Sequence, residues 1–168
     1  MDPRNSNIIP FKLDDFKTRL SHQLAFHIAT KIARKTIHRT VLDKGASTSV
    51  MSLSCWRAIG SSKINRSPTT LNTFDGHGFQ PYGLLPTIYV EVGGKSVSIH
   101  IEVIDTPLDY NLLLGRNWFY VMQAVASIVF RIVQFPFQGN IFTVDQLDFI
   151  TPSSITNDAN NVPLLNTT

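Results

Sequence analysis

The chain has 168 residues, of which 43% are hydrophobic and 16% are charged, and it contains nine glycines and nine prolines. This length and composition suit one globular domain rich in strands and turns, and they exclude an intrinsically disordered chain. The formal charge of +3 is only weak support for a nucleic-acid partner, and a lone cysteine excludes both a disulfide framework and a thiolate zinc cluster.

The N-terminal sequence has no apolar stretch of signal-peptide length, and the longest apolar run, AVASIVF, ends at Arg131. We therefore expect an intracellular protein, cytoplasmic or nuclear, that is neither secreted nor bound to a membrane. Residues 1–22 are polar and residues 151–168 are rich in Asn, Thr and Ser. Both are expected to be flexible arms on a single domain that spans residues 23–150.

The first half of this domain has the alternation of apolar and polar residues that is typical of strands. Residues 24–30 (LAFHIAT) and 36–43 (TIHRTVLD) predict an antiparallel pair around KIARK. Residues 51–60 predict a short helical turn closed by Gly60. Residues 70–85 predict a hairpin with Asp75-Gly76 at its tip.

The second half continues with strand pairs and one helix. Residues 86–92 and 96–104 flank GGK and form the clearest hairpin in the chain. Residues 110–125 predict a buried strand that runs through Gly115 into a short helix, and residues 127–135 and 140–147 predict the last strand pair. With roughly eight strands and one or two short helices, the expected fold is an all-β barrel or sandwich.

Several short motifs do not predict a site. Gly93-Gly94 fits a hairpin turn better than a phosphate-binding loop, and none of the five histidines has the spacing of metal ligands, so no metal site is expected. Cys55 is interpreted as a small buried hydrophobe rather than a nucleophile. The basic run KIARKTIHR fits a solvated face of a strand pair, so a nucleic-acid partner is not expected.

Three segments carry a resemblance to a known family. They are residues 41–52 (VLDKGASTSVMS), 73–83 (TFDGHGFQPYG) and 110–118 (YNLLLGRNW). In this order and spacing the chain closely resembles the retroviral-type (retropepsin-like) aspartic proteases, and most closely those of plant Ty3/gypsy-type retrotransposon gag-pol polyproteins. The agreement extends from about Leu24 to Leu147.

The resemblance implies a closed β-barrel of retropepsin-like (acid protease) type with one or two short helices. It implies a homodimer in which each subunit contributes one Asp43 to a shared carboxylate pair that activates water, with no metal or cofactor. The substrate would be a polypeptide, the polyprotein of the retrotransposon itself. AVASIVFRIVQF fits either a dimer strand or a core strand.

The implied site residues fall into four groups along the sequence. They are the catalytic Asp43; the active-site loop Lys44, Gly45, Ala46 and Ser47; the flap Phe74, Asp75, Gly76, His77 and Gly78; and the supporting Leu113, Leu114, Gly115 and Arg116.

Lys44 departs from the family pattern, which has Thr or Ser after the catalytic Asp and uses its hydroxyl across the dimer. An ammonium only donates hydrogen bonds, and its charge near Asp43 would favour the ionised carboxylate and drain the shared proton. A second departure is Ser47, which stands where an acidic partner for Arg116 is expected. Three hypotheses therefore stay open: an active endopeptidase, a decayed protease-like module for dimerisation or binding, and an unrelated β-barrel binding module.

Overall fold

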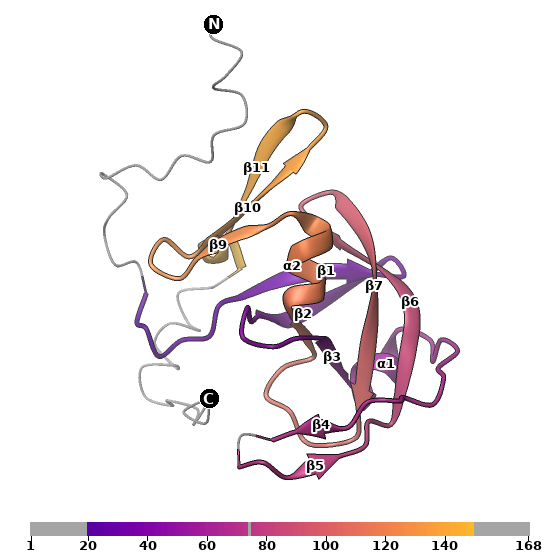
Figure 1. Ribbon diagram of the computed structural model, residues 1–168. Coiled ribbons are helices and arrows are strands. Elements are labelled where there is room, and N and C mark those ends of the chain that lie inside the picture. The colour runs from indigo at the N-terminus through magenta and orange to yellow at the C-terminus, as the bar shows by residue number, and fades with distance from the viewer. Residues whose placement is uncertain (1–19, 74, 150–168) are drawn as a thin grey trace, which may run out of the picture.

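The computed structural model describes residues 20–73 and 75–149 (Figure 1). Its strands are β1 (His27–Ile32), β2 (Lys35–Leu42), β3 (Ser49–Ser52), β4 (Leu71–Asn72), β5 (Gly78–Phe79), β6 (Gly83–Val92), β7 (Lys95–Ile104), β8 (Leu112–Leu114), β9 (Val125–Ser127), β10 (Ile132–Phe137) and β11 (Asn140–Asp145). The helices are α1 (Leu53–Ala58), α2 (Arg116–Met122) and a 3-10 turn, η3 (Gln146–Phe149). No helix in the described part of the chain is long and apolar enough to cross a membrane.

Six strands close into a barrel in the order β1-β2-β8-β3-β7-β6. Strand β8 lies between β2, to which it is parallel, and β3, to which it is antiparallel. Thr40, Val41 and Leu42 pair with Leu112, Leu113 and Leu114 in this parallel ladder. The closed barrel with two short α-helices confirms the fold expected from the sequence.

Alternation of apolar residues explains the long hairpin formed by β6 and β7. Val97, Ile99, Ile101 and Val103 are all buried, as residues on the inner face of a half-buried strand should be. The turn between the two strands is Gly93-Gly94, with φ of +56° and +87°. A Cβ on Gly93 would lie 2.9 Å from the Phe135 ring, so this turn also packs closely against β10.

The pair formed by β1 and β2 contains a β-bulge that the sequence pattern hides. Ile28 pairs with Thr40 and Thr30 pairs with Ile37, which leaves His38 and Arg39 together opposite one residue of β1. Arg39 has φ of +55°, and both His38 and Arg39 are exposed. The bulge restores the inward direction of Thr40 and Leu42 and so sets the direction in which β2 enters the next loop.

A three-stranded sheet, β9-β10-β11, follows α2 (Figure 1). The prediction of one strand over residues 127–135 is wrong, because β9 ends at Ser127 and β10 begins at Ile132. The turn between them is held by the Ser127 carbonyl, which accepts the Arg131 N–H at 2.8 Å, and Arg131 has φ of +57°. An apolar composition therefore concealed a turn in the middle of the segment.

The Arg131 side chain is 1% exposed and is held by main-chain carbonyls. Its guanidinium donates to the carbonyls of Leu24 at 2.8 Å and Ser21 at 2.5 Å. The Gln146 amide is buried beside it and donates to the Ala25 carbonyl at 3.0 Å. These contacts fasten the segment before β1 to the turn before β10, and burial lowers the pKa of Arg131.

Candidate active site

Asp43 is the first residue after β2, and its carboxylate is fixed by the turn that follows it. Oδ1 accepts the Gly45 N–H at 2.8 Å. A Cβ on Gly45 would lie 3.0 Å from the same oxygen, so a larger residue would press on the carboxylate. Asp43 is neither buried nor fully exposed, so its carboxylate is held in one orientation while solvent can still reach it.

The loop that begins at Asp43 is anchored to β8 and α2 by main-chain hydrogen bonds. The Asp43 N–H donates to the Leu114 carbonyl at 3.0 Å, and the Arg116 N–H donates to the Ala46 carbonyl at 2.8 Å. Gly115 lies between these two bonds, and a Cβ there would fall 2.2 Å from the Thr48 carbonyl oxygen. Only glycine lets the two segments approach this closely, which explains Gly115 by contact rather than by backbone conformation.

A side-chain network that sequence reasoning missed holds the far end of the loop. The Gly115 N–H donates to Ser49 Oγ at 3.0 Å, and Ser49 Oγ donates to Asn117 Oδ1 at 2.7 Å. Asn117 Nδ2 in turn donates to the His100 carbonyl on β7 at 3.0 Å. Ser49 and Asn117 stand within the segments singled out from the sequence, but polar side chains in such segments do not reveal which of them meet.

The sequence-predicted supporting residues are brought to the loop in different ways. Leu114 is buried and offers its carbonyl to Asp43, and Leu113 pairs with Val41 in β2. The Arg116 side chain is exposed, as is Ser47, and the contact between Arg116 and the loop is made by its backbone N–H instead of by its guanidinium. An acidic residue at position 47 is therefore not needed for this anchor.

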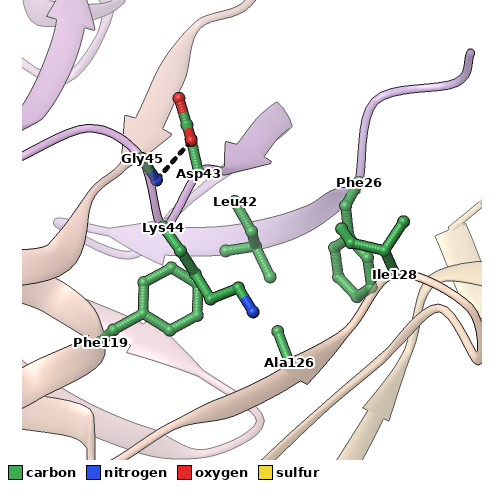
Figure 2. Close-up of a pocket in the computed structure, with 8 residues that line it drawn as sticks. All are labelled: Phe26, Leu42, Asp43, Lys44, Gly45, Phe119, Ala126 and Ile128. Carbon is green, nitrogen blue, oxygen red and sulfur yellow. Dashed lines mark hydrogen bonds between the residues drawn. The ribbon is translucent and has the colours of Figure 1, made fainter.

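The Lys44 side chain turns away from the carboxylate of Asp43. Figure 2 shows it running past the Phe119 ring toward Ala126, while the carboxylate points to the other side of the loop. Asp43, Lys44 and Gly45 line one side of a hollow of about 220 Å³ whose apolar walls are Phe26, Leu42, Phe119, Ala126 and Ile128. The long alkyl stem of Lys44 thus covers apolar surface, and Lys44 forms no ion pair with any described residue.

Tyr110 is a partly exposed residue that sequence reasoning did not single out. Burial, then the charge of Asp43 and then that of Asp109, raise the pKa of its phenol. Tyr110 opens the segment YNLLLGRNW, but nothing in that pattern indicates a raised pKa.

Strands β4 and β5 form the hairpin predicted around Asp75-Gly76, and Figure 1 shows it standing off the barrel. The Gly76 N–H donates to the Thr73 carbonyl at 2.9 Å, and Gly76 has φ of +85°. The Asp75 carboxylate accepts the Thr73 hydroxyl and the His77 N–H, and it lies 3.0 Å from His77 Nδ1. Phe74, also predicted for this hairpin, lies outside the described residues.

Hydrogen bonds to the Asp75 carboxylate lower its pKa, the Thr73 hydroxyl most and the His77 N–H next. The pair is exposed, with 67% of the Asp75 side chain and 85% of the His77 side chain accessible. Gly78 has less space for a side chain than Gly76, because a Cβ at Gly78 would lie 2.9 Å from the Thr70 methyl group. The tip is therefore a defined turn that presents the Asp75 carboxylate and the His77 ring to solvent.

The described residues offer no cluster of three or more His, Cys, Asp or Glu side chains that could hold a metal ion. Cys55 is buried, and burial raises the pKa of its thiol to about 11. What remains at the centre of the site is one oriented carboxylate on a rigidly anchored loop.

Comparisons with known proteins agree with this geometry at the level of the fold. No protein-family model and no curated protein matches the chain. The retroviral protease-like domain of Ddi1 from Leishmania major superposes with a TM-score of 0.56 and 14% identity, over 74% of this chain and 97% of that one. The EIAV protease, in complex with the inhibitor HBY-793, superposes with a TM-score of 0.52 and 16% identity, over 71% of this chain and 99% of that one. The chain therefore has the fold of the retroviral protease-like domains.

Proposed function

We propose that this protein is an aspartic-type endopeptidase that acts as a homodimer, with Asp43 from each copy forming the catalytic pair. The observation that carries the proposal is the placement of Asp43. A partly exposed carboxylate is oriented by the Gly45 N–H on a loop that β8 and α2 hold in place. The retroviral protease-like fold supports the assignment, since it is shared with a protease that binds an inhibitor.

One carboxylate on its own does not supply both an acid and a base. Two Asp43 side chains brought together about a two-fold axis would share a proton, because two adjacent carboxylates cannot both ionise cheaply. The ionised Asp43 would take a proton from water as it attacks the peptide carbonyl, and the protonated one would donate to the carbonyl oxygen. The Gly45 N–H keeps the oxygen that it contacts in a fixed position during this exchange.

Exposed apolar side chains next to the loop support the choice of a homodimer. Val125 on β9 and Ile128 and Val129 in the following turn are 40%, 48% and 46% exposed. Ile128 also lines the hollow beside Lys44, so this apolar surface is continuous with the Asp43 loop. Because β9 already pairs with β10, the segment serves as part of the fold and still offers apolar side chains to a second copy.

The proposed substrate is an extended polypeptide, the polyprotein of a retrotransposon of plant Ty3/gypsy type. The hairpin of β4 and β5 supports a polypeptide substrate, because it stands off the barrel and a strand-like peptide can pair with such a hairpin. The three sequence segments that resemble this branch of proteases support the origin.

The test is cleavage of a library of peptides with apolar pairs of residues, from pH 4 to pH 7, by the full chain and by Asp43→Asn. We expect cleavage that Asp43→Asn abolishes and that a statine-type inhibitor blocks. Asp148→Asn is the matched control, because Asp148 is exposed in η3. Cleavage that survives in Asp43→Asn would contradict the proposal. A dimer without cleavage in the parent would favour a decayed module for dimerisation or binding.

A further inference from the structure

Lys44 occupies a position that the proposed reaction does not use. It is joined directly to Asp43, and its side chain is exposed and extends past Phe119 toward Ala126 (Figure 2). The hollow that it lines is apolar apart from the residues of the loop itself. No described carboxylate neutralises its ammonium.

The proposed dimer brings the Lys44 ammonium groups of the two copies close to each other. Adjacent Cα atoms are about 3.8 Å apart, so if two Asp43 carboxylates meet at a two-fold axis, both Lys44 residues also lie near it. The lysine stem lies beside Phe119 and Ala126 (Figure 2). Ile128 lines the same hollow and is one of the exposed apolar side chains proposed for the contact between copies. A second copy that covers those side chains would enclose both cations in one interface.

We propose that Lys44 is a residue of the interface between two copies of this chain, and that its charge weakens their association. The inference rests on the proposed function, because a homodimer centred on Asp43 is what brings the two lysines together. The second copy is the expected occupant of this surface because one Asp43 makes only half of a catalytic pair. Association is then favoured by salt and by loss of the charge at this one position.

The size of the effect follows from Coulomb's law. Two unit charges about 10 Å apart weaken association by about twofold in a water-like medium and by about fifteenfold at an effective dielectric constant of 20. Salt reduces this repulsion, since the Debye length falls from about 10 Å at 0.1 M to about 3 Å at 1 M ionic strength. The penalty from Lys44 should therefore be largest in dilute salt.

The experiment is analytical ultracentrifugation of the full chain at pH 7 in 0.05 M and 0.5 M NaCl, with Lys44→Met, Lys44→Arg and Lys63→Met. Lys44→Met keeps an unbranched apolar stem and removes the charge, Lys44→Arg keeps the charge, and Lys63 is an exposed lysine outside the hollow. We expect Lys44→Met to lower the dimer dissociation constant by about two- to fifteenfold in 0.05 M NaCl. The difference should shrink in 0.5 M NaCl, and the other two variants should match the parent.

Two other outcomes would overturn the inference and can be told apart. In the first, the parent and Lys44→Met dimerise with the same dissociation constant, or Lys44→Met and Lys44→Arg tighten the dimer equally. Either result would show that the charge of Lys44 does not weaken association, and it would leave the proposed function intact. Monomers at every concentration in all four proteins, together with no peptide cleavage, would overturn the homodimeric protease itself and this inference with it.

Discussion

Replacing Gly115 by alanine should force the Asp43 loop away from β8 and α2. The new Cβ would lie 2.2 Å from the Thr48 carbonyl oxygen and 2.9 Å from the Ala46 carbonyl oxygen. The backbones must separate by about 0.8 Å to restore a distance of 3.0 Å, and both contacts are with main-chain atoms, which cannot rotate away. Gly115 has φ of −93°, so the cost comes from the clash and not from backbone strain.

Overpacking of this kind costs about 2 to 3 kcal/mol of the free energy of unfolding. For a chain of this size that corresponds to a melting temperature about 5 to 12 °C lower. Hydrogen exchange should also become faster at the N–H groups of Asp43 and Arg116, whose acceptors lie across the displaced contact. Circular dichroism melts and exchange followed by NMR would measure both effects.

Gly139→Ala is the matched control for this substitution. Gly139 has φ of +75° and no atom within 4 Å of its Cβ position, so alanine there costs about 1 kcal/mol of strain and leaves the loop unchanged. If Gly115→Ala unfolded within about 1 kcal/mol of the parent, with normal exchange at Asp43 and Arg116, the argument from close contact would be refuted.

Three further predictions test the surroundings of the site. Asp43→Asn should lower the pKa of Tyr110 in a spectrophotometric titration without returning it to its usual value, because burial is the larger cause. An unchanged pKa would show that the charge of Asp43 does not act on Tyr110. Cys55, with a thiol pKa of about 11, should resist an aromatic disulfide reagent at pH 8 in the folded protein and react once per chain in guanidinium chloride; rapid labelling of the folded protein would contradict its burial. The Asp75 pKa is lowered on folding, so the stability that Asp75 gives to the hairpin tip is complete above the ordinary pKa of 3.8 and is lost as the pH falls through the lowered pKa. NMR shifts of the Gly76 and His77 amides would measure this loss. Shifts that changed between pH 6 and pH 4.5 in the parent but not in Asp75→Asn would contradict the lowered pKa.

Much of the fold follows from local patterns in the sequence. The alternation in residues 96–104 and the Gly93-Gly94 pair predict β6, β7 and their turn, because each depends on residues that are close in the chain. The hairpin tip at Asp75-Gly76 is equally local. The short helix after Gly115 was also predicted, as a continuation of the buried strand before it.

Other features depend on contacts between distant residues and could not be predicted. Insertion of β8 between β2 and β3 joins residues about 70 positions apart, and no periodicity reports such a pairing. The turn inside residues 127–135 is set by the positive φ of Arg131, whose guanidinium is buried because carbonyls of Ser21 and Leu24 receive it. A charged residue in an apolar run usually marks an exposed position, and here that expectation fails.

The position of β8 also has a consequence for synthesis of the chain. The Asp43 loop has its anchors at Leu114, Gly115 and Arg116, so a nascent chain that has not reached these residues cannot hold the loop in place. At ordinary rates of elongation, several seconds pass between synthesis of the loop and synthesis of its anchors. During that interval, Asp43 has been synthesised but the residues that hold its loop have not. Any activity at this site is therefore delayed until the barrel has closed.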